Sequence, residues 1–447
     1  MDRILPYKEN DSKKLFRRLI MPGFKLSFHG IADWYLFSLF VLPTYFGIRL
    51  IFFDLTAFRL FEVLLLWCIL KSSTRKNQFI KLVKSCPNNI WIGIYLFIVI
   101  YTNLIHPSLN TIMYWLTNGV FVIFCVAYLV IYEYGVERFL DKIKIYIWII
   151  CTLSPIQVIT GQSPFALLDT LGKVVTTSRF GEIRVMGNCT VANGYAMYLM
   201  ILFPIMCCDW NARKIDFKKN GILLLLMVLN IFLTGSRLTI GTMILGVFLC
   251  FIMQNRRELK QSLGFILIGI PIMMLFLYYF KDLDFVKGLL RTFFSAFDEI
   301  FDTSYALQYG ADAQTLYNSS YYRELLVKNT IFGDWLNPWL GKGGNYKLNM
   351  FIQGYYIHSC DNYYVGQYIT YAWPGLIVWL MMSGSFFVSC IKKWILERNV
   401  LVWCIIVSII CYFISLWYLD QLQTFPIMMS MFGLSYAILK EKMEYDT

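Results

Sequence analysis

The sequence predicts an all-α, polytopic membrane protein with about 12 transmembrane helices, and three observations carry this prediction. Its 447 residues are 58% hydrophobic and only 15% charged, whereas a soluble domain carries roughly 25% charged residues. The mean hydropathy is +0.57. Apolar runs of about 20 residues recur along the chain. These runs are continuous and lack the alternation of a transmembrane β-strand, which excludes a β-barrel.

Twelve apolar segments are the predicted spans, and they alternate with polar connections. The hydrocarbon core of a bilayer is about 30 Å thick and a helix rises about 1.5 Å per residue, so segments of this length can cross it, some of them tilted. The predicted spans cover residues 33–50, 56–71, 90–105, 109–132, 143–160, 190–208, 221–235, 237–254, 262–280, 362–390, 399–419 and 424–439.

Lys and Arg predict the orientation of these spans. About two thirds of the 40 Lys and Arg lie in alternate connections, on one side of the predicted bilayer. Because cytoplasmic loops retain positive charge, these connections and both termini are predicted to be cytoplasmic. The chain then divides into a basic cytoplasmic segment (1–30), spans one to nine with an outer loop at 161–189 (31–280), a long extracytoplasmic loop between spans nine and ten (281–361), and spans ten to twelve with a cytoplasmic tail (362–447).

The net charge of +12 does not indicate a nucleic-acid partner, because the basic residues are spread over the connections between spans. The 12 cysteines do not indicate a disulfide framework, since most lie inside predicted spans, where Cys behaves as a small hydrophobe. The spacing of Cys and His is not typical of a zinc site. We therefore predict no metal site and no cofactor.

Basic residues on the outer side are exceptions to the charge pattern, and the first two are Arg179 and Arg184 in the loop before span six. Gly181 lies between them and Gly187 follows them. Arg presents a planar fork of donors that matches phosphate, so both residues, Arg184 above all, are predicted to bind an anion. The alternative is a solvated loop in which Glu182 pairs with the arginines.

The turn Thr234-Gly235-Ser236-Arg237 joins spans seven and eight at the outer surface. A cation at this depth costs a few kcal/mol unless it is paired or hydrated. Arg237 also stands at the start of a helix, where free N–H groups favour an anion. Thr234, Ser236 and Arg237 are therefore predicted to bind phosphate. The alternative is an arginine that extends to the lipid headgroups.

The long outer loop contains a third arginine, Arg323, in a segment with helical spacing over 313–332. Arg323 either belongs to the anion site or pairs with Glu324 on the helix surface. A Gly-rich segment at 338–344 follows, and it is neither a Walker loop nor a dinucleotide fingerprint. Apolar residues over 285–301 fall on one helical face, which predicts a helix on the outer leaflet.

His358 lies where the chain re-enters the membrane, followed by Asp361 and Asn362. A histidine can act as a general base near neutral pH. On a helical turn Asp361, three residues on, would orient it. The alternative is a polar loop residue with no part in the chemistry. Within the bilayer, Arg59 and Glu62 stand three residues apart in span two, and a structural ion pair between them is favoured over a proton pathway.

The order of these motifs resembles the O-antigen polymerase and ligase superfamily, which includes Wzy-type polymerases and WaaL-type ligases. The resemblance rests on the Arg184–Gly187 loop, the hairpin that ends in Arg237, Arg323 followed by a Pro-x-x-Gly-x-Gly stretch, and His358 with Asn362 before the next span. It covers roughly residues 180–380.

The resemblance implies a GT-C-like glycosyltransferase of the bacterial inner (plasma) membrane, with its active site on the outer, periplasmic face. Its substrates would be undecaprenyl-pyrophosphate-linked glycans for O-antigen of lipopolysaccharide, for capsule or for a related polysaccharide. Membrane lipids surround it, and a chain-length regulator and a flippase of the same pathway are its expected partners. Arg179, Arg184, Thr234, Ser236, Arg237 and Arg323 would bind the pyrophosphate, His358 or Asp361 would be the base, and Asn362 would line the site.

Three functions remain open at this point. A repeat-unit polymerase is favoured, with direct displacement and inversion at the sugar and without a metal ion. An O-antigen ligase would use the same donor with a different acceptor. A flippase or exporter would be expected to carry charges in the middle of its spans, whereas this chain carries most of its polar groups at the outer rim.

Overall fold

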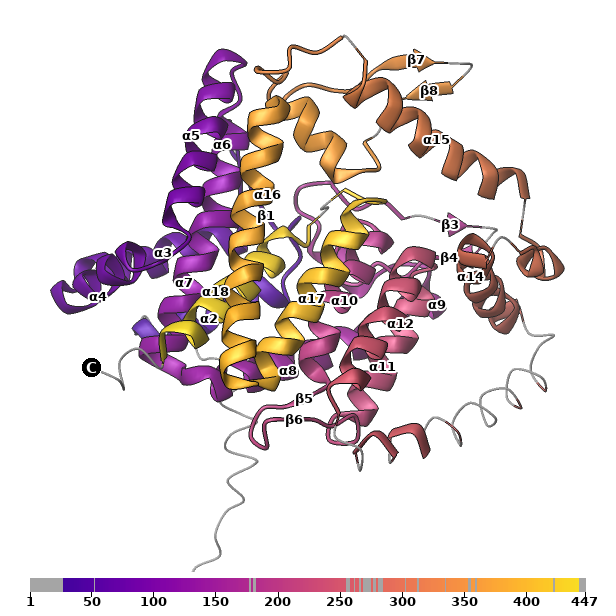
Figure 1. Ribbon diagram of the computed structural model, residues 1–447, viewed down its shortest axis with the longest axis horizontal. Helices are drawn as coiled ribbons and strands as arrows, with labels where there is room; N and C mark the ends of the chain where they lie inside the picture. Colours follow the sequence, from indigo (N-terminus) through magenta and orange to yellow (C-terminus); the bar gives the residue numbers. More distant parts are fainter. Residues whose placement is uncertain are drawn as a thin grey trace, which may run out of the picture.

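The structure, a computed structural model, describes residues 27–51, 53–176, 178–179, 182–254, 258–260, 262–264, 267, 275, 279, 284–301, 303–311, 313–333, 335–352, 355–357, 360–420 and 423–441. The described chain is mostly helical (Figure 1). Its α-helices are α2 (Phe28–Phe40), α3 (Ala57–Lys71), α4 (Ser73–Lys84), α5 (Asn89–Ile105), α6 (Leu109–Trp115), α7 (Phe121–Tyr128), α8 (Gly135–Leu153), α9 (Ile156–Thr160), α10 (Ala192–Met206), α11 (Gly221–Leu233), α12 (Arg237–Ile252), α14 (Asp284–Phe301), α15 (Ala313–Ile331), α16 (Tyr363–Glu397), α17 (Val400–Leu416) and α18 (Phe425–Glu441).

Short elements fill the connections between these helices. Two π-helical segments, η1 (Leu116–Val120) and η2 (Leu129–Tyr134), continue α6 and α7, and two 3₁₀ segments are η3 (Pro164–Leu168) and η4 (Tyr305–Tyr309). Four antiparallel hairpins pair β1 (Gly47–Arg49) with β2 (Asp54–Thr56), β3 (Ser178–Arg179) with β4 (Glu182–Ile183), β5 (Cys208–Asp209) with β6 (Lys214–Ile215), and β7 (Met350–Ile352) with β8 (Tyr355–Ile357).

Among the described residues, two helical segments are long and apolar enough to cross a membrane, Leu109–Thr160 and Tyr363–Glu397. Helices α4 and α5 make a third if this pair, bent by 90°, is one span. Gly135, at φ +73°, divides the first segment into the two predicted spans 109–132 and 143–160. Five shorter apolar helices match further predicted spans: α10, α11, α12, α17 and α18. The total of 12 spans stays a prediction.

The first predicted span, 33–50, is wrong in its extent. Helix α2 ends at Phe40, and residues 47–49 form strand β1 instead. Pro43 and the tight β1–β2 pairing explain this, because proline removes a backbone donor and hairpin strands must leave the helix axis. The predicted span 262–280 lies largely outside the described residues.

The predicted cytoplasmic connections lie together on one side of the molecule. Lys142 pairs with Asp33 at 2.8 Å, and Glu133 lies 3.5 Å from His29 and 3.8 Å from Arg75. These contacts join the start of α2, the connection around residue 75 and the connection at 131–144. These three segments therefore lie on the same side of the molecule. That this side is cytoplasmic stays a prediction.

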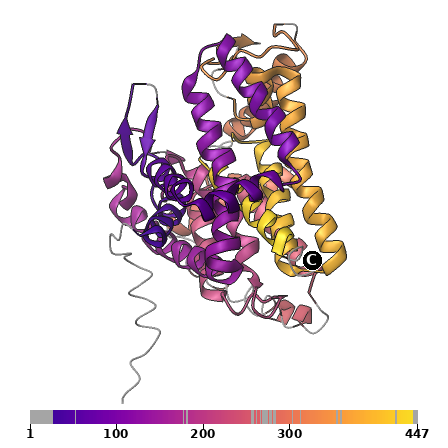
Figure 2. The ribbon, with the colours of Figure 1, turned by 90° about the vertical axis from the view of Figure 1, so that its left-hand side faces the viewer.

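The predicted outer connections meet one another in the same way. Asn103, at the end of α5, accepts a hydrogen bond from the Gly344 N–H at 3.0 Å, and Ser108 donates to Asn345 at 2.9 Å. Figure 1 shows β7, β8 and α15 at one end of the helices and β5–β6 at the other. In Figure 2 the indigo hairpin β1–β2 rises toward the same end as β7 and β8.

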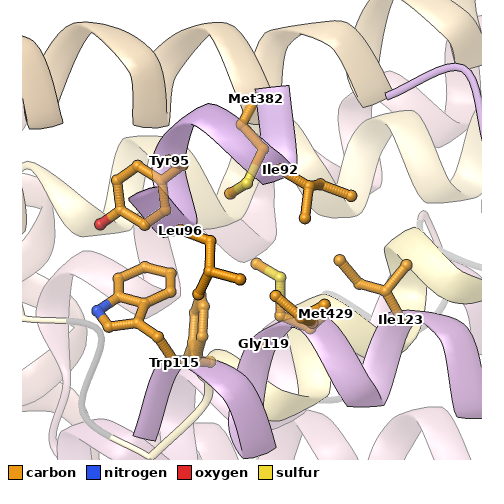
Figure 3. A pocket seen from close by; sticks show the side chains of 10 residues that line it. Ile92, Tyr95, Leu96, Trp115, Gly119, Ile123, Met382 and Met429 are labelled. Atoms are coloured by element: carbon orange, nitrogen blue, oxygen red, sulfur yellow. The ribbon is translucent and has the colours of Figure 1, made fainter. Parts of the chain in front are cut away.

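Helix α10 is at the centre of the packing. Every residue of α10 is buried except Asn193, and the helix packs against α11, α12, α17 and α18. One pocket of about 10 Å³ lies between α5, η1, α16 and α18, lined by residues such as Leu96, Trp115 and Met382 (Figure 3). It is too small to hold more than about one water molecule.

The long outer loop is predicted to be a wall of a site and not a separate domain. Helix α14 forms as its spacing predicts, and it packs against α11, α12 and η4. Phe293 contacts Phe232 of α11 at a ring distance of 6.4 Å. Helix α15 matches the predicted helix at 313–332 and packs against α16. The loop is therefore joined to the apolar helices through both of its helices.

Helix α16 is broken at Ala372, whose φ of 56° and ψ of −162° are not helical. Pro374 follows and has no N–H, so the Thr370 carbonyl loses its helical donor. The Ile369 carbonyl loses its donor because Trp373 N–H is directed elsewhere at the break. The Gly-rich segment replaces these donors, because Lys342 N–H donates to the Ile369 carbonyl (2.8 Å) and Gly343 N–H donates to the Thr370 carbonyl (3.1 Å).

The same segment also accepts the free N–H of the break, since Trp373 N–H donates to the Pro338 carbonyl at 3.2 Å. The glycines permit this approach. A Cβ on Gly341 would lie 2.1 Å from the Thr370 oxygen, and one on Gly344 would lie 1.9 Å from the Thr111 hydroxyl. The Gly-rich segment at 338–344 therefore pairs with the broken helix.

Replacing Gly341 by alanine is expected to destabilise the protein. The added Cβ would meet the Thr370 carbonyl, and overpacking of this kind costs roughly 1–3 kcal/mol. Thermal unfolding of detergent-solubilised Gly341→Ala measures the loss. Gly384→Ala, in the same helix but with no atom within 4 Å of its Cβ, is the control and should be neutral or stabilising. Equal unfolding temperatures for the two variants would contradict the close contact.

Candidate functional site

The Arg184 side chain lies against the turn between α11 and α12. Its Nε donates to the Thr234 carbonyl at 2.6 Å, and its Nη2 donates to the Asn193 side-chain oxygen at 2.5 Å. Gly235 makes the turn at φ +62°, and a Cβ there would lie 3.3 Å from Arg184 Nε. A bare backbone in the left-handed conformation therefore allows the arginine to lie on the turn.

Backbone hydrogen bonds hold the Arg184 loop in this place. Val185 N–H donates to the Leu233 carbonyl at 3.0 Å. Gln157, buried in α9, accepts from Met186 N–H at 2.9 Å and donates to the Arg184 carbonyl at 3.3 Å. The two segments that were predicted separately as anion sites are thus one structural unit.

Two positive charges share this unit. Burial, together with the neighbouring charge of Arg237, lowers the pKa of Arg184 to about 10. Arg184 still carries its charge at neutral pH, and within the described part of the chain no carboxylate forms an ion pair with it. Like charges at close quarters repel, and an anion between them would relieve this repulsion.

Helix α12 begins at Arg237, as predicted, with Ser236 as its N-cap residue. The hydroxyls of the turn have partners inside it: Thr234 Oγ1 donates to the Ile231 carbonyl (2.6 Å) and accepts from Ser236 N–H (3.2 Å), and Ser236 Oγ lies 2.9 Å from Thr239 Oγ1. In this conformation the two hydroxyls shape the turn. Their binding of phosphate stays a prediction.

The start of α12 lies beside the end of α17, because the two helices are antiparallel. Cys411 Sγ donates to the Thr242 carbonyl at 3.3 Å, and further along Trp403 Nε1 donates to the Leu249 carbonyl at 3.1 Å. Extending this register brings Arg237 to the level of the last turn of α17.

The start of α16 lies at the same level on α17. Tyr364 donates its hydroxyl to the Phe413 carbonyl at 2.8 Å, and its ring lies 5.8 Å from that of Trp417. The short first part of α16, before the break at Ala372, therefore points its N-terminus toward the end of α17.

Arg323 reaches this place from α15. Its guanidinium carbon lies 5.4 Å from the centre of the Tyr418 ring, two residues after α17 ends. A cation over an aromatic face contributes about 0.5–2 kcal/mol. The structure thus brings Arg184, Arg237, Arg323 and the start of α16 around the end of α17. For Arg179, only the backbone is described, and it pairs with Glu182 in the β3–β4 hairpin.

The predicted catalytic segment is described in part. His358 lies outside the described residues. Asn362 caps α16 by accepting from Val365 N–H at 3.1 Å, and its buried Nδ2 has no hydrogen-bond partner in the described structure. Asp361 is exposed next to it. Residues 355–357 form a strand and α16 begins at Tyr363. The roles of His358 and Asp361 stay predictions.

The turn after α17 contains residues that the sequence analysis missed. Burial raises the pKa of the Cys360 thiol to about 12, and the negative charges of Asp420 and Asp361 act in the same direction. Asp420 therefore stands in electrostatic range of the start of α16, and Tyr418 supports Arg323. The only sequence signal for these residues was their position in a short outer connection between spans eleven and twelve.

The comparison with protein families agrees with the resemblance described above. Residues 222–380 match the family model Wzy_C, described as O-Antigen ligase. The match begins in α11, includes the turn between α11 and α12 as well as α14 and α15, and ends in α16. No curated protein sequence matches the chain. Residues 222–380 are thus similar to a domain of the O-antigen ligase and polymerase family, whose enzymes are membrane proteins that act on lipid-linked polysaccharide units.

This domain and the apolar helices together identify an integral membrane protein. Arg237, Arg323 and Asn362 lie inside the matched range, whereas Arg184, Tyr418 and Asp420 lie outside it. The site around the end of α17 is therefore completed by segments that the family match does not cover.

Removing the Tyr418 ring is expected to weaken the site. In Tyr418→Ala, Arg323 loses the aromatic face that holds it, and about 0.5–2 kcal/mol of support is lost. Affinity for inorganic pyrophosphate, measured by calorimetry on purified protein, should fall about two- to thirtyfold. Tyr418→Phe keeps the ring and is the control. Equal loss in both variants would show that the hydroxyl, and not the ring, is what matters.

Proposed function

We propose that this protein is a polysaccharide repeat-unit polymerase. It transfers a growing glycan from its undecaprenyl-pyrophosphate carrier to the terminal sugar of a new lipid-linked unit, on the outer face of the bacterial inner membrane. The observation that carries the proposal is the convergence of Arg184, Arg237 and Arg323 at the end of α17, beside the start of α16.

The arginines fit the chemistry of the leaving group. When the bond between the sugar C1 and the pyrophosphate oxygen breaks, its electron pair stays on the pyrophosphate, and negative charge grows there in the transition state. Guanidinium groups that are already held in place stabilise this charge at little cost in reorganisation. They supply the positive charge that a metal ion provides in many other phosphate-transfer sites.

The acceptor hydroxyl needs a base at the same point. In the proposed step its oxygen forms the new bond to C1 while its proton passes to His358, because a histidine side chain is suited to general base catalysis. Asp361 is the alternative base. A direct displacement inverts the configuration at C1, because the acceptor attacks the face opposite the pyrophosphate.

An O-antigen ligase is the second candidate. The matching family is described as O-antigen ligase, which favours this function. The donor chemistry would be unchanged, since the pyrophosphate would still leave from the same arginines. Only the acceptor would differ. The arginines that bind the pyrophosphate therefore do not distinguish the two functions. Only the products of the reaction do.

His358→Ala is expected to abolish chain extension in cells that make the polymer. Without the base, single repeat units should remain where the wild type gives a ladder on a gel. A full ladder at normal protein level would refute the role of His358. Long chains that accumulate on the lipid carrier would instead indicate a ligase, and loss of all surface sugar would indicate a flippase.

Arg237→Lys is expected to reduce polymer formation by at least tenfold, because a point charge cannot replace a two-pronged donor. The amount of polymer per molecule of enzyme measures this. Arg138→Lys, an exposed residue on the opposite side of the molecule, is the matched control and should be unchanged. Near-normal polymer from Arg237→Lys would make Arg237 a membrane anchor only.

A further inference from the structure

A second, polar cavity lies outside the arginine site just described. It has a volume of about 170 Å³ and lies between β2 and α3, α6 and η1, and the start of α18. This is room for several water molecules, each of which occupies about 30 Å³ in the liquid. Its polar lining includes Arg59, Asn110, Tyr114, Asn118, Lys173 and Gln423.

Arg59 lines this cavity and is only 7% exposed. Its Nη1 donates to the Asp54 carbonyl at 2.7 Å. The ion pair with Glu62 expected from the sequence is not formed. Glu62 is fully buried, and neither of its carboxyl oxygens has a hydrogen-bond partner in the described structure. A buried guanidinium thus faces a polar cavity without a paired carboxylate, which is a costly arrangement unless an anion or water completes it.

The lining combines these polar side chains with Phe58 and Pro426. Asn118 is buried, whereas Asn110 and Lys173 are exposed. The Lys173 ammonium is paired with the Asp54 carboxylate. Of the three charged groups that line the cavity, two are positive and one is negative. The lining therefore suits an anionic group that also carries hydroxyls, because the amides can bond to the hydroxyls.

The turn between α17 and α18 connects this cavity with the arginine site. Gln423, which lines the cavity, accepts from Thr190 N–H at 2.7 Å, six residues after Arg184. The charge of Asp420 acts on Tyr114, in the cavity, and on Cys360, at the start of α16. The short turn between α17 and α18 thus interacts both with the cavity and with the arginine site.

We propose that this cavity binds an anionic group of the acceptor glycan, carried either by an acidic sugar or by the acceptor's own pyrophosphate. This inference rests on the proposed function, because it assigns the donor to the Arg184 side and the acceptor to the Arg59 side. Asp420 lies within electrostatic range both of Tyr114 in the cavity and of Cys360 near the start of α16. Arg59 would provide the charged fork, and Asn110, Asn118 and Gln423 would bond to neighbouring hydroxyls.

Binding to the purified full-length protein in nanodiscs tests the proposal, with calorimetry as the readout. The probes are glucuronate, its neutral analogue glucuronamide, and inorganic pyrophosphate. Glucuronate or pyrophosphate should bind, and Arg59→Gln should weaken that binding by about tenfold or more, as expected for loss of a charge-assisted contact. Arg184→Gln should leave the Arg59-dependent binding intact, although it removes pyrophosphate binding at the arginine site. Lys76→Gln, on exposed α4, is the charge-matched control.

A second pair of variants protects the test against misfolding of Arg59→Gln. Asn110 is exposed, so Asn110→Asp should fold normally and repel the anion, whereas Asn110→Gln should not. Preferential binding of glucuronate would identify an acidic sugar as the source, and preferential binding of pyrophosphate would identify the lipid-linked head. Equal binding of glucuronamide, or loss of binding in Arg184→Gln alone, would overturn the proposal.

The proposal and the proposed function can fail separately. If His358→Ala abolishes the polymer ladder but Arg59→Gln neither weakens anion binding nor shortens the chains, only the acceptor cavity is refuted. If Arg59→Gln weakens anion binding while His358→Ala gives a normal ladder, the cavity binds its anion but the catalytic scheme is refuted.

Discussion

Pairing of backbone groups at the break in α16 holds the outer segments to the apolar helices. A proline in a helix leaves carbonyls without donors, and in an apolar environment every such group must find a partner. Here the partners come from the Gly-rich segment at 338–344. The break leaves a short first part of α16, which brings Asn362 and Tyr364 to the end of α17. These hydrogen bonds also attach the segment that follows α15 to α16, and this attachment supports the position of Arg323 on α15.

The charges of the site depend on this framework. Arg184 and Arg237 are held close enough that one lowers the pKa of the other, although like charges repel. Backbone hydrogen bonds from the Arg184 loop to the α11–α12 hairpin overcome that repulsion. A rigid arrangement of this kind is what an anion site requires, because the groups need not reorganise when charge appears. Arg59, which lines the separate cavity, is likewise a buried cation held in place by the surrounding structure.

Much of the architecture was predictable from local patterns. Apolar runs located α10, α11, α12, α17 and α18, and helical spacing located α14 and α15. The distribution of Lys and Arg grouped the connections into two sets, and contacts such as Lys142 with Asp33 agree with one of them. The errors have physical causes. The β1–β2 hairpin shortened the first predicted span, and Arg59 donates to the Asp54 carbonyl in place of the expected pairing with Glu62.

What the sequence by itself determined was which segments are apolar, where the turns lie, and which polar residues stand at the outer rim. These properties follow from residue type and spacing, because burial and helix periodicity act locally. Only the tertiary structure decided which rim residues meet. The antiparallel packing of α12 on α17 set Arg237 beside the turn that contains Tyr418 and Asp420. In the described structure, the packing around α3 also leaves the Glu62 carboxyl group without a hydrogen-bond partner and places Arg59 in the lining of a cavity. Such choices depend on contacts between residues far apart in the chain, and no local pattern encodes them.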